Sequence, residues 1–254
     1  QIEVLVVDDS LLMQRVLCDI LQSDRQVKVV GTARDGEEAL AKIDSLHPDV
    51  VTMDIEMPKM NGLTAVRRLM ETNPLPVIMI SALTQKEAQM TYKALEFGAI
   101  DYVPKPSGQI SLNMDAVRDE LLFKIKTAAT ANLSLMKPIQ NENQRDVQAV
   151  SDKVISIAAS TGGPHAITQV LKALPADVPP ILIVQHMPKV ITKHFAEGLN
   201  GICKFAVKEA QEGDRVQEAL ALVAPGGFHM TVTKEKKIHL TQDAPVNFVR
   251  PSAD

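Results

Sequence analysis

The chain has 254 residues, of which 45% are hydrophobic and 23% are charged, so it is long enough for two domains with packed interiors. Its net charge of −4 argues against a nucleic-acid-binding surface as the main function, and no apolar run approaches the roughly 18 residues that a membrane-spanning helix needs. No signal peptide precedes the first predicted strand, and the two cysteines, Cys18 and Cys203, lie far apart in apolar contexts. We therefore expect a cytoplasmic protein that does not insert into a membrane.

Strand and helix patterns alternate regularly over the first half of the chain. Short apolar runs predict strands, and apolar residues three or four positions apart predict helices between them. The predicted strands are Ile2–Val7, Val27–Gly31, Val50–Met53, Val77–Ile80 and Ile100–Val103, and the predicted helices are Leu11–Leu21, Asp35–Ser45, Leu63–Glu71, Gln85–Phe97 and Asp115–Thr127. This alternation is typical of a doubly wound parallel sheet with helices on both faces. We predict an α/β domain over residues 1–127.

The composition changes between residues 128 and 152, where Asn, Gln, Ser, Thr and Pro accumulate, and this change predicts an interdomain linker. From Val154 the alternation resumes, which predicts a second doubly wound α/β domain over residues 153–254. Its predicted elements are Val154–Ala159, Ala166–Leu174, Ile181–Gln185 and Ile191–Leu199, followed by short strands at Phe205–Val207, Ala221–Val223, His229–Thr233 and Ile238–Leu240. No element completes the last pattern, so we expect this domain to be incomplete at its C-terminal end.

Polar residues follow four predicted strands of the first domain. Asp8 and Asp9 close the first strand, Asp54 closes the third, Ser81 ends the fourth, and Lys105 follows the fifth. Because the carboxyl ends of parallel strands meet at one edge of a sheet, one crevice can hold all five side chains. Clustered carboxylates repel one another unless a cation lies among them, and Mg²⁺ is the favoured ion. Helix-capping aspartates are the alternative, but capping does not explain the whole set.

These residues lie in motifs that resemble the receiver domain of two-component response regulators over residues 1 to about 125. The matching motifs are Val6-Val7-Asp8-Asp9-Ser10, Met53-Asp54-Ile55-Glu56-Met57-Pro58-Lys59-Met60-Asn61-Gly62, Ser81-Ala82 and Lys105-Pro106. The resemblance implies a flavodoxin-like fold, phosphorylation of Asp54, and a histidine kinase as phosphodonor.

The same resemblance implies roles for the surrounding residues. Mg²⁺ would be held by Asp9, Asp54 and the backbone carbonyl of Glu56, with Asp8 assisting through water. Lys105 would bind the phosphate oxygens. The resemblance also implies that two further residues, Ser81 and Tyr102, rearrange when the phosphate arrives.

The second domain contains a candidate nucleophile at a strand end. Ser160 follows the apolar strand Val154–Ala159 and precedes a glycine pair, where the chain can turn into a helix. The next strand, Ile181–Gln185, delivers His186 to a corresponding position. A serine hydroxyl needs a base within hydrogen-bond reach, so the sequence predicts a Ser160–His186 pair, with Thr161 positioning the imidazole or binding substrate. A phosphate-binding glycine turn with Ser160 and Thr161 as ligands is the alternative.

The other histidines are weaker candidates for the base. His47 and His239 lie in contexts typical of the surface. His165 opens a helix, whose N-terminus disfavours a protonated ring, and His194 lies within a helix. His229 follows a glycine turn and stays a candidate.

Joined to the receiver pattern, the second half is similar to the chemotaxis methylesterase family, CheB. The motifs are Ala158-Ala159-Ser160-Thr161-Gly162-Gly163-Pro164, Gln185-His186-Met187-Pro188 and Ala224-Pro225-Gly226-Gly227-Phe228-His229-Met230. The resemblance covers essentially the whole chain. It implies hydrolysis of glutamate methyl esters on methylated chemoreceptors, with release of methanol, and deamidation of receptor glutamines, with Ser160 as nucleophile and His186 as base. The family's third catalytic residue, an aspartate, is expected beyond Asp254.

Two other functions are compatible with the sequence. The second domain could be a protein-binding output module without catalysis, controlled by the receiver, or it could bind a nucleotide. An output domain that binds nucleic acid is disfavoured, because the second half lacks a helix-turn-helix pattern and a basic recognition helix.

Overall fold

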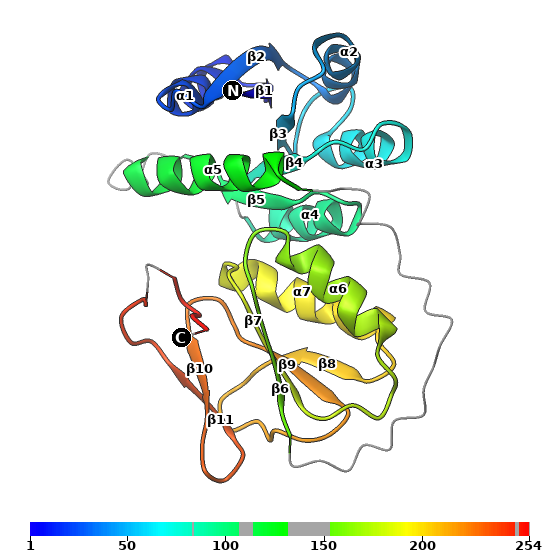
Figure 1. The fold of residues 1–254 in the computed structure, drawn as a ribbon, viewed down its shortest axis with the longest axis vertical. Helices are drawn as coiled ribbons and strands as arrows, with labels where there is room; N and C mark the ends of the chain where they lie inside the picture. Colours follow the sequence, from blue (N-terminus) through cyan, green and yellow to red (C-terminus); the bar gives the residue numbers. More distant parts are fainter. Residues whose placement is uncertain (83, 107–113, 132–152, 247–248, 254) are drawn as a thin grey trace. The chain divides into compact units, whose positions relative to one another are not determined.

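A computed structural model describes residues 1–82, 84–106, 114–131, 153–246 and 249–253 (Figure 1). The chain divides into two compact units, residues 1–137 and 138–254. Most of the predicted linker, from residue 132 to 152, lies outside the described residues, as does Asp254, so the predicted domain boundaries stay predictions. None of the helices in the described segments has both the length and the hydrophobicity needed to cross a bilayer.

The first unit is built on one parallel five-stranded sheet with the strand order β2-β1-β3-β4-β5. The strands are β1 (Ile2–Val7), β2 (Val27–Ala33), β3 (Val50–Asp54), β4 (Val77–Ser81) and β5 (Asp101–Pro104). All residues of β3 and β4 are buried, which is why their sequences are apolar without alternation. Because the strand order reverses between β1 and β3, the helix after β1 packs on one face and the helices after β2, β3 and β4 pack on the other.

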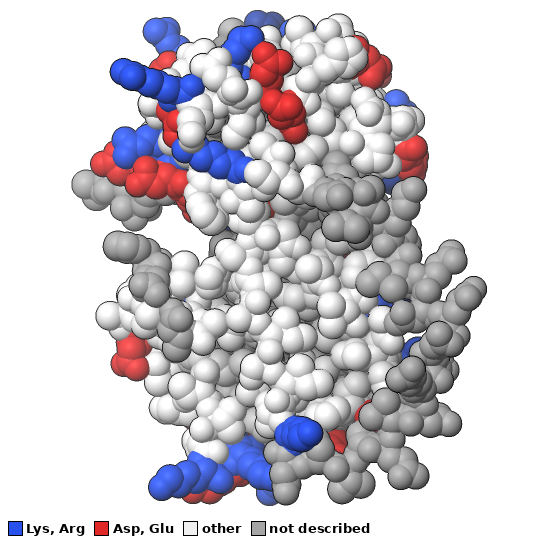
Figure 2. Space-filling model, viewed as in Figure 1, with Lys and Arg blue, Asp and Glu red and all other residues white. Residues whose placement is uncertain are grey.

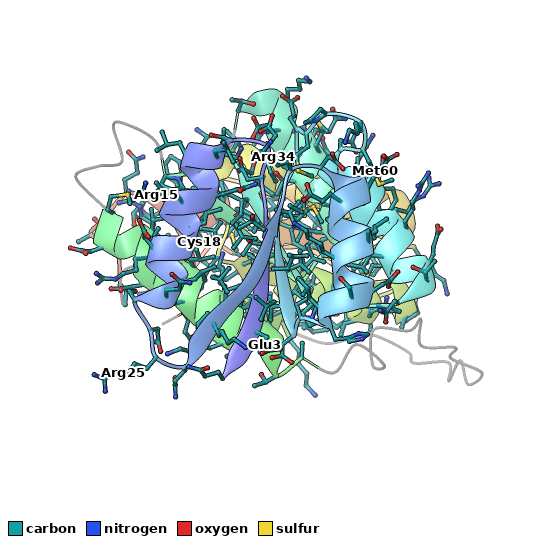
Figure 3. The ribbon with its side chains drawn as sticks, turned by 90° about the horizontal axis from the view of Figure 1, so that it is seen from above. Glu3, Arg15, Cys18, Arg25, Arg34 and Met60 are labelled. Atoms are coloured by element: carbon teal, nitrogen blue, oxygen red, sulfur yellow. The ribbon has the colours of Figure 1, made fainter. Side chains whose placement is uncertain are left out.

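Five helices cover the two faces of this sheet. They are α1 (Leu11–Gln22), α2 (Gly36–Leu46), α3 (Gly62–Thr72), α4 (Gln85–Glu96) and α5 (Met114–Ala129). In Figure 3, α1, which carries Arg15 and Cys18, lies with α5 on one side of the strands, and α2 lies on the other. A core of apolar side chains from the strands, α1 and α5 fills the first of these layers. The predicted doubly wound α/β architecture is confirmed for this unit.

Polar caps start four of these helices. The side chains of Ser10, Asp35, Asn61 and Thr84 each accept a hydrogen bond from the backbone N–H three residues later. Such a cap stabilises a helix by about 1 kcal/mol. The starts of these helices at the carboxyl edge of the sheet are therefore fixed by hydrogen bonds. In Figure 3, Arg34 and Met60 mark this edge, and Glu3 lies at the opposite one.

The second unit contains a parallel four-stranded sheet with the order β6-β7-β9-β8. Its elements are β6 (Ile155–Ala159), α6 (Gly163–Ala173), β7 (Ile181–Gln185), α7 (Lys189–Ile202), β8 (Ala206–Glu209) and β9 (Leu220–Val223). Helices α6 and α7 contact each other and pack against strands of this sheet. The predicted α/β class is confirmed here as well.

Two details of the second unit differ from the sequence prediction. Helix α6 begins at Gly163 instead of Ala166, because Gly162 turns the chain with a φ of 75° and Pro164 is favourable in a first helical turn. The last two strands, β10 (His229–Val232) and β11 (Ile238–Thr241), form a separate antiparallel ribbon instead of extending the parallel sheet.

Charges are mixed on the visible surface of the first unit. Figure 2 shows Lys and Arg side chains interspersed with Asp and Glu side chains there. This pattern agrees with the small net charge of −4.

Candidate functional sites

Three carboxylates meet at the carboxyl edge of the first sheet. Strands β1 and β3 are neighbours with Val7 opposite Met53, so the residues that follow them lie side by side. Ligand oxygens of Asp8, Asp9 and Asp54 all lie within 4.8 Å of one another. Asp8 and Asp54 are buried, whereas Asp9 is exposed. The predicted convergence of these side chains is therefore present in the structure.

Lys105 faces the two buried carboxylates of this cluster. Its Nζ lies 2.7 Å from Asp54 Oδ2 and 3.2 Å from Asp8 Oδ2. Apart from these ion pairs, neither oxygen has a hydrogen-bond partner among the described residues. Two buried anionic oxygens thus share one ammonium, with the carboxylate of Asp9 beside them. This donor set fits a hard divalent cation such as Mg²⁺, which prefers oxygen ligands.

Burial shapes the protonation of the crevice. Desolvation raises the pKa of Asp54 to about 6; Lys105 opposes this shift and the charge of Asp8 adds to it. Burial would lower the pKa of Lys105, but the carboxylates of Asp54 and Asp8 outweigh burial and raise it. At neutral pH Asp54 is therefore mainly ionised beside a protonated lysine, as a carboxylate nucleophile requires.

The remaining predicted residues of the receiver occupy the surrounding positions. Ser81 is buried at the end of β4, and its backbone carbonyl accepts a hydrogen bond of 2.7 Å from Lys105 N. The half-exposed Glu56 forms an ion pair with Lys86. Tyr102 is buried on β5, and the ammonium nitrogen of Lys124 lies 5.0 Å from the centroid of its ring. The metal role of Glu56 and the rearrangement of Ser81 and Tyr102 stay predictions.

In the second unit, Ser160 and His186 lie side by side. Ala159 of β6 is opposite Gln185 of β7, so the residues that follow these two strand ends are neighbours. His186 Nδ1 lies 3.2 Å from Ser160 Oγ, within hydrogen-bond distance. Ser160 is exposed and His186 is half-buried, so the pair is accessible. This geometry is that of a hydroxyl beside a candidate general base.

A buried glutamine supports the turn that carries Ser160. Gln185 Nε2 donates to the carbonyl of Ser160 at 3.0 Å, and Gly163 N donates to the same oxygen at 2.8 Å. A Cβ atom at position 163 would lie 2.0 Å from Gln185 Oε1, so only glycine fits beside this side chain. The sequence places Gln185 at the end of a predicted strand, but its supporting role was not predicted, although a glutamine that ends an apolar strand was a usable signal. Thr161 Oγ1 is buried without a hydrogen-bond partner among the described residues, and its supporting role stays a prediction.

A second glycine turn supports the loop after His186. A Cβ atom at Gly226 would lie 2.3 Å from both Met187 O and Lys189 N. Gly226 N also donates to Thr192 Oγ1 at 3.2 Å. The backbone of this turn therefore packs directly against the segment that leads from His186 into α7.

His229, which the sequence left as a candidate base, binds backbone groups instead. Its Nδ1 lies 3.3 Å from the amide of Ser252, and its Nε2 lies 3.2 Å from the carbonyl of Ala244. An amide N–H can only donate, so Nδ1 accepts and Nε2–H donates in a neutral ring. His229 thus holds the chain that follows β11 and is not placed as the base for Ser160.

Comparison with known proteins identifies a family for each half of the chain. The response regulator receiver domain matches residues 4–116, and the CheB methylesterase domain matches residues 155–254. A protein-glutamate methylesterase/protein-glutamine glutaminase from Pyrococcus horikoshii is 47% identical over all of this chain and 72% of its own length. A protein of the same name from Symbiobacterium thermophilum is 44% identical over all of this chain and 75% of its own length. The chain belongs to the protein-glutamate methylesterase/protein-glutamine glutaminase family.

A solved structure gives a further comparison. The response regulator domain of Thermotoga maritima CheB has 50% sequence identity to this chain, covers 52% of it and 98% of its own length, and superimposes with a TM-score of 0.47.

The raised pKa of Asp54 predicts how the receiver unit of this methylesterase family member depends on pH. Because the folded state holds the Asp54 proton more tightly than the unfolded state, stability falls as pH rises from about 4 to about 6 and stays lower above that window. Asp54→Asn should therefore raise the free energy of unfolding at pH 7 by on the order of 2 kcal/mol, with little difference at pH 4.

Tyrosine fluorescence during urea unfolding checks this prediction, because the chain has no tryptophan and its two tyrosines, Tyr92 and Tyr102, both lie in the receiver unit. Asp44→Asn, at an exposed position on α2, is the matched control. Millimolar Mg²⁺ should stabilise the unsubstituted protein and not Asp54→Asn. A variant that is less stable at pH 7 would contradict the electrostatic account of the crevice.

The contact of Gln185 with the Ser160 turn predicts an effect on serine reactivity. Gln185→Leu keeps the volume but removes the hydrogen bond to the Ser160 carbonyl, so the turn should lose its fixed geometry. We expect Ser160 labelling by a fluorophosphonate to slow by about tenfold. Gln169→Leu, on the half-buried part of α6, is the control. Equal labelling rates for Gln185→Leu and the unsubstituted protein would contradict a supporting role of Gln185 for the Ser160 turn.

Proposed function

We propose that this chain is a phosphorylation-controlled chemotaxis response regulator that hydrolyses glutamate methyl esters and deamidates glutamines. The observation that supports the chemistry most directly is the 3.2 Å approach of Ser160 Oγ and His186 Nδ1. The names of the relatives supply the substrate class, and the Asp54 crevice supplies a site for regulation.

In the proposed ester reaction, Ser160 Oγ attacks the carbonyl carbon of a glutamate methyl ester. His186 Nδ1 accepts the serine proton and returns it to the leaving methoxide, which departs as methanol. In the second half, the oxygen of a water molecule attacks the acyl carbon while His186 takes one of its protons. The bond between that carbon and Ser160 Oγ then breaks, His186 returns the proton to Ser160 Oγ, and the glutamate side chain is released as a carboxylic acid that ionises. With a glutamine substrate the same steps release ammonia.

In the proposed phosphorylation, the carboxylate of Asp54 attacks the phosphorus atom of a phosphohistidine. The P–N bond breaks, the histidine of the kinase takes up a proton, and an aspartyl phosphate forms. The ammonium of Lys105, already 2.7 Å from Asp54, stabilises the phosphoryl oxygens. Mg²⁺ held by Asp9, Asp54 and the Glu56 carbonyl would neutralise charge that builds up on the transferred group.

The proposed partners follow from this chemistry. A histidine kinase is the phosphodonor, and methylated chemoreceptors are the substrates, with both encounters placed in the cytoplasm. The receiver would restrict access to Ser160 until Asp54 is phosphorylated. A switch of this kind needs only a few kcal/mol of difference between two arrangements.

Removal of the serine hydroxyl tests the proposal. Ser160→Ala should lower the initial rate of methanol release from methylated receptor membranes by at least about 10³-fold, because no other nucleophile faces His186 in the proposed mechanism. Ser156→Ala is the matched control and should keep the full rate, because Ser156 is an exposed serine on β6, the strand that leads to Ser160.

The same assay separates the enzyme from a binding-only output module. Phosphoryl incorporation at Asp54 from acetyl phosphate should be equal in Ser160→Ala, Ser156→Ala and the unsubstituted protein. Full methanol release by Ser160→Ala would contradict the catalytic role of Ser160 and favour an output domain that acts by binding.

A further inference from the structure

The carboxylate of Glu87 binds two donors at the end of strand β4. Glu87 Oε2 accepts a hydrogen bond of 3.2 Å from Ser81 Oγ and one of 2.6 Å from Ala82 N. Glu87 is the third residue of α4, whose N-cap is Thr84. A glutamate at this helical position commonly reaches back to the N-cap amide. Here its side chain reaches past the N-cap to the strand.

These two donors belong to the edge that carries the phosphoacceptor. Strand β4 lies between β3 and β5, and Asp54 is opposite Ile80, the residue before Ser81. The carbonyl of Ser81 accepts from Lys105 N at 2.7 Å, and the Lys105 ammonium contacts Asp54 at the same distance. Ser81 therefore occupies the strand end between the nucleophile and the lysine.

The hydroxyl of Ser81 faces the carboxylate of Glu87 in a buried setting. Thr91 Oγ1 lies 3.0 Å from Ser81 Oγ and 2.8 Å from the backbone carbonyl of Glu87, and both Ser81 and Thr91 are fully buried. The Glu87 carbonyl can only accept, so it takes the Thr91 hydroxyl hydrogen, and the Ser81 hydroxyl donates to the carboxylate of Glu87 at 3.2 Å. A hydroxyl and the next backbone N–H form a donor pair that also suits an oxygen of a phosphoryl group.

We propose that Glu87 is an internal anion that occupies the phosphoryl-binding donors of Ser81 and Ala82 until Asp54 is phosphorylated. This inference rests on the proposed phosphorylation of Asp54. Two anions cannot share the same two donors, so the phosphoryl group gains them only when Glu87 releases them. Glu87 is thus a positioning residue that opposes anion binding in the resting protein.

Release of Glu87 also changes the start of α4. The adjacent Lys86 forms an ion pair with Glu56 in the loop after β3, so the first turn of α4 is tied to both sides of the crevice. When the carboxylate of Glu87 leaves the strand end, this turn loses its link to β4. Occupancy of Asp54 is thereby transmitted to α4 by a defined pair of hydrogen bonds.

Beryllofluoride with Mg²⁺, a non-covalent analogue of an aspartyl phosphate, tests the inference in the full chain. Its dissociation constant is measured by titration calorimetry for the unsubstituted protein and for Glu87→Ala, Glu87→Gln and Thr84→Ala. We expect Glu87→Ala to bind about tenfold more tightly, because a charge-assisted contact no longer competes. Glu87→Gln should show a smaller gain, since its amide oxygen still accepts hydrogen bonds.

Thr84→Ala removes the cap of α4 without touching Ser81, and it should change the affinity by less than about twofold. An equal gain in Glu87→Ala and Thr84→Ala would assign the effect to helix destabilisation and overturn the inference. So would unchanged or weaker binding in Glu87→Ala. Asp54→Asn is the control that shows whether beryllofluoride binds at the phosphoacceptor. If binding to the unsubstituted protein does not depend on Asp54, the proposed phosphorylation fails, and the inference fails with it.

A structural signal provides an independent readout. The amide proton of Ala82 donates to a carboxylate at 2.6 Å and should resonate far downfield in the resting protein. Glu87→Ala should move this resonance upfield, and addition of beryllofluoride with Mg²⁺ should move it in the unsubstituted protein as well. If the Ala82 amide resonance stays at the same position after both changes, Glu87 and the phosphoryl analogue do not compete for this donor.

Discussion

The register of neighbouring parallel strands is the constraint on which both sites depend. In the first unit Val7 lies opposite Met53, and the next residues are carboxylates. In the second unit Ala159 lies opposite Gln185, and the next residues are the serine and the histidine. A shift of one residue in either pair would turn the polar side chains to the other face of the sheet. Burial of the strands determines their register, and the register in turn determines which polar side chains lie together at each site.

The first site combines burial with unfavourable electrostatics. Burial raises the pKa of Asp54, and the neighbouring Asp8 raises it further, so the ionised crevice reduces the stability of the folded unit near neutral pH. Lys105 offsets only part of this cost, because one ammonium faces two buried carboxylates. The same imbalance makes the crevice receptive to a divalent cation. Hydrogen bonds at its rim, from Ser81 and Ala82 to a glutamate, show that an anion can also be held there.

The sequence predicted the layers of the fold and the residues that meet at strand ends, because apolar runs and strand order determine both. It did not predict contacts that depend on side chains reaching across elements. The supporting role of Gln185 was not predicted, because the sequence does not show that its amide turns toward the Ser160 carbonyl. Glu87 looks like an ordinary helix-starting glutamate, and only the structure shows that it reaches β4. The antiparallel pairing of β10 with β11 depends on a turn that the alternation of apolar residues does not specify.

The hydrogen bond between Ser160 and His186 is the most direct test of strand register as the origin of the chemistry. Nitrogen-15 NMR of the imidazole rings reports the environment of each ring nitrogen, and Ser160→Ala removes the hydroxyl that faces Nδ1. The account predicts that the Nδ1 resonance of His186 shifts in this variant, while the resonances of His47 in the receiver unit do not move. A His186 Nδ1 resonance that is identical with and without the Ser160 hydroxyl would contradict it.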